Sequence, residues 1–415
     1  MKHFSSECKR ILYLENGQGY GGAVICLELL LQALDRNRYE PIVSTSYMDS
    51  NYQNLRNIAP LTYLPHRFFD KNSLMDQLIT KSSVFPKDAV LTKVFRQLLS
   101  IADYTINTLP YIVRLIALCR QKQIDLIHLN NEPVCNMGGL IAAKVLGLPV
   151  VCHVRASVLS WNTPTARWLY SLVDRFIAVA DWVKEEVLAM GVSPDRVQTI
   201  WDGRDLAPFV VNEDRNAIRS ELRLSPDEVA VAMFSRLNPW KGHKVFIEAM
   251  ETVFSKRPNC RAFIVGGATA KFQPYDEELK EHVARRNLTE RIMFMGQRND
   301  VPRLMKAMDI LVHASVEPDP YPGVVLEAML MGRPVVASNE GGPAEALDDG
   351  RTGVLCRPGE AETLAKKIIE LADEPKRRDE LGAAAKEVAW ERYALEKHAQ
   401  HIERIYDHLL SIRHG

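Results

Sequence analysis

The chain has 415 residues, 47% of them hydrophobic and 25% charged, and its 52 lysines and arginines balance 52 aspartates and glutamates. This length exceeds what one hydrophobic core usually serves, so we expect two domains. The balanced charge gives no bulk attraction to nucleic acid, which argues against a nucleic-acid partner.

The cysteines and the apolar stretches indicate in which cellular compartment the protein is expected. The seven cysteines are scattered and lack a Cys-x-x-Cys pair, so we expect neither a disulfide framework nor a zinc site, and a reducing cytoplasm suits them. The first ten residues are too polar to begin a signal peptide. Arg114 and Lys144 interrupt the longest apolar stretches, so no segment predicts a membrane span. We expect a cytoplasmic protein, soluble or peripheral at the inner membrane surface.

A glycine-rich turn follows the first predicted strand. Residues 11–15 predict a strand and residues 23–34 a helix. Between them Gly17, Gly19 and Gly22 satisfy G-x-G-x-x-G, which taken alone predicts a dinucleotide site and an NAD-dependent oxidoreductase. The glycines are also explained by a tight turn between strand and helix.

The second predicted strand weakens the dinucleotide interpretation. A dinucleotide site needs an acidic residue at the end of that strand, residues 41–46, and the nearby candidate, Asp49, comes late. Further on, the range from 81 to 122 holds seven lysines or arginines against two aspartates, among many apolar residues. This range predicts either an amphipathic surface that docks on anionic lipid or ordinary helices with a solvated basic face.

Strands and helices then alternate. Residues 124–129 and 149–154 predict strands with a helix between them at 136–146, so the domain is α/β with a parallel sheet. A further strand begins at Arg175, and another begins at Val197. The polar composition of residues 203–226 predicts an irregular hinge.

Polar residues follow two of these strands. Asn130 comes directly after the first, and His153 and Arg155 lie at the carboxyl end of the second, where open parallel sheets bind ligands. A buried or capping histidine is the alternative for His153. The pattern does not choose between His153 and Arg155 as the ligand-facing residue.

Two cations follow the first strand of the predicted second domain. The strand at 228–234 leads to Arg236, a turn brings up Lys241, and a helix begins at Val245. This arrangement is suited to placing two cations beside one diphosphate. Unspecific surface cations are the alternative.

The stretch from 309 to 337 predicts strand, turn, helix and strand. Apolar runs at 309–314 and 334–337 are typical of buried parallel strands. Prolines exclude a helix up to Gly323, so we expect the helix to begin at Val324, with Val325 in its first turn. Its free N–H groups then lie at the carboxyl edge of the sheet, where a phosphate is the natural occupant.

Two carboxylates bracket this helix start, because Asp319 lies eight positions before Glu327. They would repel a phosphate unless they point past it, in which case they bind ribose on one side and a sugar on the other. The alternative is a turn aspartate and a first-turn helix glutamate, each favoured locally.

This spacing resembles the acidic-x7-acidic motif of the retaining GT-B glycosyltransferases of family 4 type, the glycosyl transferases group 1. The usual motif has Glu at both ends with Phe-Gly between, whereas here Asp319 is followed by Pro-Tyr-Pro-Gly. Residues 341–345 and 350–355 continue the resemblance in order.

The resemblance implies two Rossmann-like α/β domains whose parallel sheets face a cleft. Residues 1–202 form the acceptor-side domain and 203–390 the nucleotide-sugar-binding domain, while a terminal helix of about 391–415 packs back on the first. It also implies transfer of a hexose or N-acetylhexosamine from a UDP or GDP sugar to a glycan or lipid-linked acceptor, with retention and without metal or cofactor, as in polysaccharide biosynthesis.

The resemblance also assigns roles to residues. Arg236 and Lys241 would hold the donor diphosphate and neutralise the departing nucleotide. The expected catalytic residues are Arg236, Lys241, Asp319 and His153. The expected donor-binding residues are Gly21, Gly22, Gln297, Arg298, Gly323, Val324, Val325 and Glu327, with Arg155 and Asn130 on the acceptor side. A nucleotide-sugar epimerase and a non-catalytic sugar-nucleotide binding protein remain alternatives.

Overall fold

The computed structural model describes residues 8–17, 21–47, 52–66, 99, 103–159 and 162–413. The chain forms two compact units. The first consists of Met1–Ala178, Val183–Ile200 and Ala399–Gly415, and the second of Val179–Trp182 and Trp201–His398. The chain thus leaves the first unit two residues before the expected boundary at 202 and rejoins it at Ala399, against an expected return near 391.

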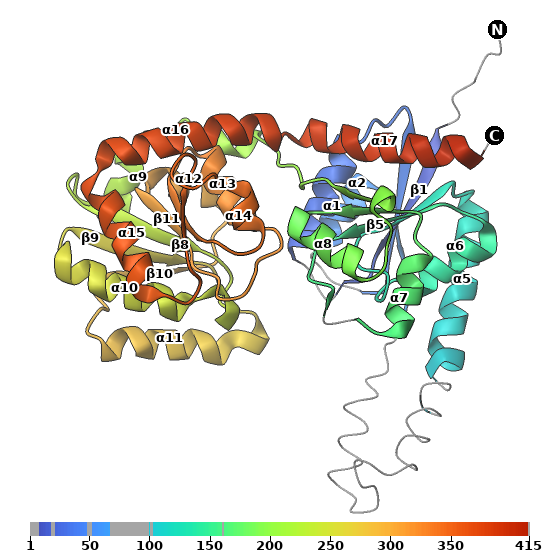
Figure 1. Ribbon diagram of the computed structural model, residues 1–415, viewed down its shortest axis with the longest axis horizontal. Helices are drawn as coiled ribbons and strands as arrows, with labels where there is room; N and C mark the ends of the chain where they lie inside the picture. The colour runs from blue at the N-terminus through green and yellow to red at the C-terminus, as the bar shows by residue number, and fades with distance from the viewer. Residues whose placement is uncertain are drawn as a thin grey trace, which may run out of the picture. The chain divides into compact units, whose positions relative to one another are not determined.

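The first unit is built on a parallel sheet in the order β3-β2-β1-β4-β5-β6-β7. Its strands are β1 (Lys9–Glu15), β2 (Tyr39–Thr45), β3 (Leu61–Tyr63), β4 (Leu126–Leu129), β5 (Val150–Val154), β6 (Arg175–Ala178) and β7 (Val197–Thr199). Its helices are α1 (Gly22–Ala33), α2 (Gln53–Ile58), α5 (Leu109–Lys122), which continues the π-helix η2 (Tyr104–Thr108), α6 (Met137–Leu146), α7 (Pro164–Ser171) and α8 (Asp181–Ala189). Helices lie on both faces of the sheet, as the buried apolar strands require (Figure 1).

The C-terminal helix α17 (Leu395–Arg413) completes the core of the first unit. Its Tyr406 is buried, and the Tyr406 hydroxyl lies 3.0 Å from the Tyr13 hydroxyl of β1 and 2.6 Å from Nδ1 of His128 in β4. The Tyr39 hydroxyl donates to Asp407 at 2.5 Å. The helix is therefore attached by polar contacts as well as by its apolar stripe.

The second unit repeats the plan with the strand order β10-β9-β8-β11-β12-β13, again parallel. Its strands are β8 (Val229–Phe234), β9 (Cys260–Val265), β10 (Ile292–Gly296), β11 (Ile310–His313), β12 (Val335–Ser338) and β13 (Val354–Cys356). Its helices are α9 (Arg215–Glu221), α10 (His243–Lys256), α11 (Gln273–Arg285), α12 (Val301–Ala307), α13 (Gly323–Leu330), α14 (Gly342–Ala346), α15 (Ala361–Asp373) and α16 (Pro375–Arg392).

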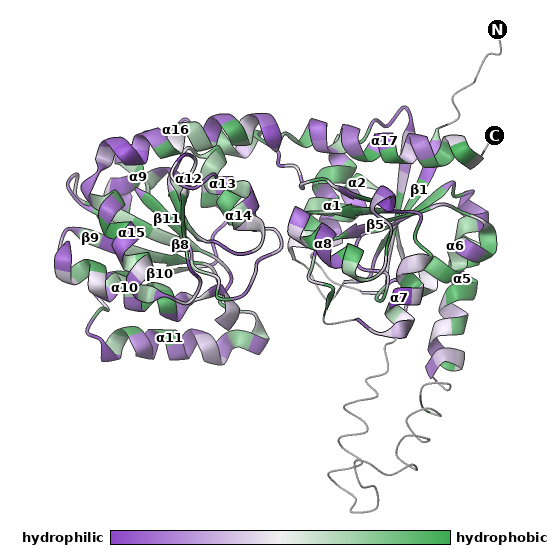
Figure 2. Cartoon of the chain, in the orientation of Figure 1, coloured by the Kyte–Doolittle hydropathy of each residue, from purple (hydrophilic) through white to green (hydrophobic). Residues whose placement is uncertain are grey.

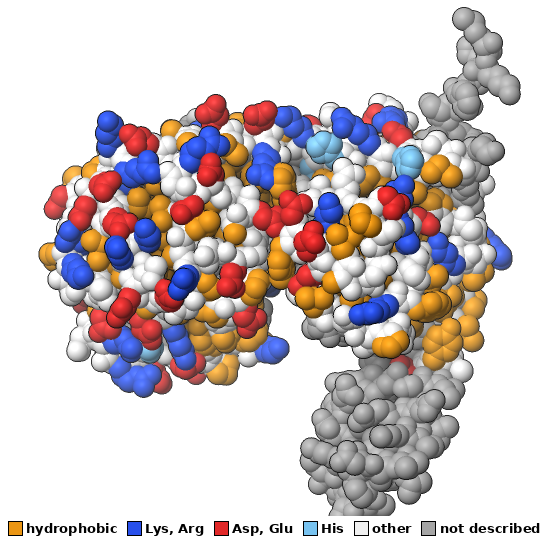
Figure 3. Space-filling view, in the orientation of Figure 1, with side chains coloured by type: hydrophobic (Ala, Val, Ile, Leu, Met, Phe, Trp, Pro, Cys, Tyr) orange, Lys and Arg blue, Asp and Glu red, His pale blue; other side chains and the backbone are white. Residues whose placement is uncertain are grey.

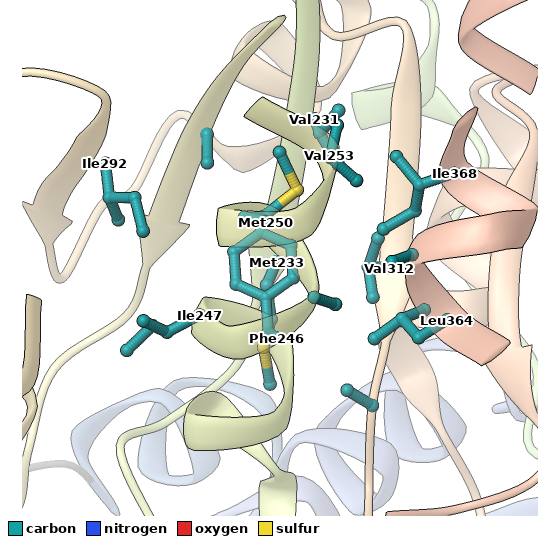
Figure 4. Close-up of a cluster of buried hydrophobic side chains, with 14 of the residues drawn as sticks. Val231, Met233, Phe246, Ile247, Met250, Val253, Ile292, Val312, Leu364 and Ile368 are labelled. Atoms are coloured by element: carbon teal, nitrogen blue, oxygen red, sulfur yellow. The ribbon is translucent and has the colours of Figure 1, made fainter. Parts of the chain in front are cut away.

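Alternate residues of β8 pack into two different cores. Val231 and Met233 face a cluster that includes Phe246 and Met250 of α10 (Figure 4). Their neighbours in β8, such as Ala232, face the other cluster, to which α12, α13 and α16 contribute. Figure 2 shows the result, with apolar strands inside and polar residues on the outer helix faces. Both sheet faces are thus buried, so the functional groups of this unit collect at the sheet edge.

The predicted irregular hinge at 203–226 is wrong for its second half, where α9 forms. The Asp214 carboxylate caps this helix by accepting from the Ala217 N–H at 3.1 Å. Arg215 and Arg219 then pair with Asp309 at 2.6 and 2.9 Å. Composition alone indicates a linker here because these charges are satisfied only by a partner that is distant in the sequence.

The surface carries both signs of charge, interspersed over the face shown in Figure 3. Within the described ranges, no helix is long and apolar enough to cross a membrane. All seven cysteines are free thiols. Half of the basic range from 81 to 122, for which we considered lipid contact, lies outside the described residues, as do Asp49 and Gly19.

Candidate functional site

The strand order of the second sheet defines where a ligand is expected. From β8 the chain proceeds to β9 and β10 on one side, and from β11 to β12 and β13 on the other. The order therefore reverses between β8 and β11, and open α/β sheets bind ligands at the carboxyl ends of the strands at such a point. Arg236 and Lys241 follow β8, and Asp319 follows β11. The sheet thus brings these three predicted residues to one edge.

Close backbone packing holds the loop after β8 against the end of β11. The Val316 N–H donates to the Trp240 carbonyl at 2.8 Å. Gly242 has a φ of 80°, and a Cβ at this position would lie 1.9 Å from the Ala314 carbonyl oxygen. Only glycine satisfies both conditions. The loop that presents Lys241 is therefore fixed before any ligand binds.

Lys241 and Asp319 form an ion pair within this edge. The Asp319 side chain is buried, and its Oδ2 also lies 3.1 Å from Nε2 of His313, which in turn lies 3.0 Å from the Ser315 hydroxyl. Burial would raise the pKa of Asp319, but the hydrogen bond to His313 and the Lys241 ammonium hold it well below its usual range. Burial also lowers the pKa of Lys241, against the opposing effect of Asp319. The sequence predicted a sugar contact for Asp319. In the structure its carboxylate contacts Lys241 and His313, which the sequence did not indicate.

Of the two predicted cations, Arg236 is the exposed one. Within the described part of the chain its guanidinium has no hydrogen-bond or ion-pair partner. Its charge nevertheless contributes to lowering the pKa of Lys241, so the two cations lie close enough to repel. An anion placed between them would relieve this repulsion.

Helix α13 begins at Gly323, one residue before the expected start at Val324. The Val325 N–H donates to the Pro322 carbonyl at 2.9 Å, so it is used inside the turn. The preceding turn is held by the Gly342 N–H, which donates to the Asp319 carbonyl at 2.7 Å. The helix start and the acidic turn therefore form one rigid piece at the sheet edge.

Glu327 lies one turn into α13 beside an unexpected residue, Arg204. Burial raises the pKa of Glu327, and Arg204 partly offsets this effect. Sequence reasoning missed Arg204 because it belongs to the connection between the units, far from the motif in sequence. Its signal was a cation directly after Asp202-Gly203, where a strand has just ended.

Gln297 and Arg298 follow β10 and are exposed. Arg298 makes a two-bonded pair with Asp300, both contacts at 2.8 Å. Gln297 lies beside the glycine turn after β9, where a Cβ on Gly267 would come within 3.3 Å of it. Both predicted donor-binding residues therefore reach the same sheet edge, while the Arg298 side chain is engaged by Asp300.

The first sheet also reverses its strand order, between β1 and β4. Glu15, the last residue of β1, is fully buried. Its carboxylate accepts from the Gly17 N–H and the Asn131 amide, both at 2.9 Å, and from the Asn130 amide. Burial raises the pKa of Glu15 despite these bonds. Sequence reasoning missed Glu15, although an acid ending a buried strand before a glycine turn is itself a signal.

Asn130 and His153, two of the predicted residues, are buried in the first unit. The Asn130 amide is used internally, because its oxygen accepts from Arg155 at 2.8 Å while its nitrogen donates to Glu15. His153 points into the sheet layer, with its ring 5.7 Å from that of His128. Arg155 lies just beyond β5 and is half-buried. The sequence did not choose between His153 and Arg155 as the ligand-facing residue. In the structure Arg155 is the one that lies at the sheet edge.

Gly21 and Gly22 begin α1 at the same edge. Gly21 is extended, with φ −167° and ψ −165°, and its carbonyl accepts from the Val24 and Ile25 N–H groups. A Cβ on Gly22 would meet nothing within 4 Å among the described residues. No described residue therefore occupies the space beside the Gly22 Cα at the start of α1. In the described ranges no three His, Cys, Asp or Glu side chains are grouped as metal ligands.

Comparison with known proteins agrees with this geometry. The model of the glycosyl transferases group 1 matches residues 214–388, and that of Glycosyltransferase Family 4 matches residues 20–207. A lipopolysaccharide core biosynthesis mannosyltransferase of Rhizobium meliloti is 28% identical over 51% of this chain and 60% of its own length. A D-inositol 3-phosphate glycosyltransferase of Streptomyces scabiei is 28% identical over 64% of each chain. The chain therefore spans less than two thirds of the length of these curated relatives.

A solved structure extends the similarity over nearly the whole chain. Anabaena Alr3699/HepE in complex with UDP superposes with a TM-score of 0.78 and 25% identity, covering 96% of this chain and 99% of that protein. The same protein has been solved in complex with UDP-glucose, at a TM-score of 0.77. The expected fold class, two α/β units with parallel Rossmann-like sheets, is confirmed.

Proposed function

This chain belongs to the glycosyl transferases group 1 family, and we propose that it transfers a hexose from UDP-hexose to a glycan or lipid-linked acceptor with retention of configuration. One observation carries the proposal. Arg236, Lys241 and the start of α13 meet where the second sheet reverses its strand order. Two cations and the positive end of the α13 dipole at that point suit the diphosphate of a nucleotide sugar.

UDP is our choice of nucleotide because Alr3699/HepE, similar along nearly its whole length, binds UDP and UDP-glucose. The hexose is our choice of sugar for the same reason. A glycan or lipid-linked acceptor follows from the family and from the lipopolysaccharide core mannosyltransferase among the relatives. The proposal gives the donor to the second unit and the acceptor to the carboxyl edge of the first.

The residues of the second unit would act on the leaving group. The bond between the anomeric carbon and the diphosphate oxygen breaks, an acceptor hydroxyl oxygen bonds to that carbon on the same face, and the hydroxyl proton leaves with the diphosphate. Negative charge then grows on the diphosphate, and Arg236, Lys241 and the α13 dipole would stabilise it. Lys241 can serve while paired, because an ammonium has three donors and Asp319 takes one. We infer that Asp319 positions Lys241.

A non-catalytic sugar-nucleotide binding protein is the second candidate. The observation that favours it is the buried pair of Asp319 with Lys241, which takes part of the predicted machinery out of direct contact with the sugar. Such a protein would bind UDP-glucose without breaking the bond between the anomeric carbon of glucose and the diphosphate oxygen.

A binding screen followed by a hydrolysis assay tests the proposal. UDP, GDP, ADP, UDP-glucose and NAD are each added in a thermal unfolding experiment, since a ligand that binds the folded state raises the midpoint. We expect UDP and UDP-glucose to raise it, and slow release of glucose from UDP-glucose when no acceptor is present. Binding without release, also in the presence of glycan acceptors, would favour the second candidate. Stabilisation by NAD alone would refute both.

A further inference from the structure

Arg204 lies at the first turn of α13, where space and not backbone conformation requires a glycine. Gly323 is not among the glycines with positive φ. A Cβ there would lie 2.7 Å from Nη2 of Arg204 and 3.8 Å from Oε1 of Glu327. The guanidinium carbon also lies 5.2 Å from the centre of the Tyr321 ring. The missing side chain of Gly323 therefore makes room for the guanidinium beside Glu327.

The backbone that carries Arg204 is held on both sides. The Arg204 N–H donates to the Tyr393 carbonyl at 2.8 Å. The Tyr321 hydroxyl donates to the Asp202 carbonyl. A Cβ on Gly203 would lie 2.9 Å from Cα of Leu395, so this segment is closely packed. The guanidinium thus extends from a fixed backbone toward the helix start.

Arg204 is also the charge that acts on Glu327. Helix α13 packs against β11, β12, α14 and α16. Among the described residues of these elements, His313 of β11 bonds to Asp319, and Glu345 of α14 accepts from the Asp181 and Trp182 N–H groups. Lys386 of α16 lies against Gly332, beyond the far end of α13. β12 carries no charged residue. Within the described part of the chain, Arg204 is the one ionised group that shifts the pKa of Glu327.

We propose that Arg204 is a positioning residue of the donor site, which holds Glu327 as an oriented carboxylate that accepts hydrogen bonds from the ribose hydroxyls of the donor nucleotide. The inference rests on the proposed function and deepens it. Without the guanidinium, burial would keep Glu327 protonated to a higher pH. A protonated carboxyl group is a poorer acceptor for two hydroxyls, so ribose recognition would weaken as the pH falls.

The test compares nucleotides with and without ribose hydroxyls. Dissociation constants for UDP and 2′,3′-dideoxy-UDP, and for the matching guanosine pair, are measured by calorimetry from pH 5.5 to 8. The variants are Arg204→Met, Arg204→Lys and Glu327→Gln, with Arg351→Met as a control that removes an exposed arginine of the same unit. Ratios to the wild type at each pH cancel the titration of the phosphates.

We expect Arg204→Met to weaken UDP binding on the order of tenfold, with a larger loss at pH 5.5, and to leave dideoxy-UDP binding unchanged. Arg204→Lys restores most of the affinity, Glu327→Gln weakens UDP binding at every pH, and Arg351→Met behaves as the wild type. Gly323→Ala keeps Arg204 but displaces it, so its loss should resemble that of Arg204→Met.

A loss that is equal for UDP and dideoxy-UDP, and independent of pH, would overturn the inference, because Arg204 would then act on the phosphates or on the fold. Unchanged binding in Arg204→Met would overturn it as well. If the wild-type chain binds GDP and not UDP, the proposed donor is wrong. The role of Arg204 is then tested by comparing the binding of GDP with that of 2′,3′-dideoxy-GDP.

Discussion

The two sheets reverse their strand order in the same way, yet the side chains at their carboxyl edges differ in charge. At the first edge the buried carboxylate of Glu15 is enclosed by backbone and amide donors. At the second edge the buried carboxylate of Asp319 is held by a lysine and a histidine, with Arg236 exposed beside them. Topology therefore fixes where a ligand can bind, and the side chains decide its chemistry.

The difference in charge suits two different ligands. Cations and a helix start at the second edge favour an anion such as a diphosphate. At the first edge Arg155 donates to the Asn130 oxygen and amide donors enclose Glu15, so the described cation of that edge is engaged internally, unlike Arg236. This division agrees with a donor in the second unit and an acceptor at the first.

Removing the cations of the second edge should have the largest effect. We expect Arg236→Ala and Lys241→Ala each to lower the rate of UDP-glucose hydrolysis on the order of a hundredfold, the usual loss for one donor to a developing charge. Thermal unfolding should separate the two variants. Arg236 is exposed, so its loss leaves the midpoint unchanged, whereas loss of Lys241 leaves Asp319 buried without its main cation and destabilises the fold by about 3 kcal/mol.

Arg155→Ala is the matched change at the first edge. Because hydrolysis needs no glycan acceptor, we expect this variant to keep wild-type affinity for UDP and most of the hydrolysis rate, and to lose transfer to an acceptor. A loss of UDP affinity as large as that of Arg236→Ala would contradict the division between the two edges.

Sequence patterns predicted the edges but not the contacts within them. Apolar runs and glycine turns located β8, β11 and the start of α13 to within two residues, and parallel pairing then brought Arg236, Lys241 and Asp319 together. The pairing of Lys241 with Asp319 could not be predicted, since it joins residues far apart in the chain and depends on side-chain geometry.

Buried polar clusters escape sequence patterns for the same reason. The position of Glu15 at the end of a buried strand was a signal, but its partners Asn130 and Asn131, which follow β4, could not be predicted. The second half of the expected hinge forms α9 because Asp309, distant in sequence, satisfies its arginines. Local composition carries no information on such partners, so it places at the surface polar residues that the fold buries.

The two buried carboxylates should respond to pH with opposite sign. The folded-state pKa of Glu15 is raised, so its contribution to stability is present below about pH 4.3 and is lost as the pH rises through the folded value. The pKa of Asp319 is lowered, so its contribution is present above about pH 3.9 and is lost as the pH falls. A tenfold difference in acidity between the folded and unfolded chain corresponds to about 1.4 kcal/mol of stability.

Urea unfolding of Glu15→Gln and Asp319→Asn between pH 3 and 7 measures both effects. We expect the stability difference between the wild type and Glu15→Gln to become less favourable to the wild type as the pH rises. The difference for Asp319→Asn should become less favourable to the wild type as the pH falls. If the two stability differences change with pH in the same direction, the two edges do not differ in the way described.

The smallest expected effect comes from Gly22, at the start of α1. A Cβ on Gly22 meets nothing within 4 Å among the described residues, whereas one on Gly323 meets Arg204 at 2.7 Å. We expect Gly22→Ala to stabilise the fold by about 0.5 kcal/mol, because alanine restricts the unfolded chain and fits the helix. If a substrate approaches α1 as predicted, the same variant loses transfer activity severalfold while its thermal midpoint rises. A stabilised Gly22→Ala with full activity would contradict the predicted approach of a substrate to the start of α1.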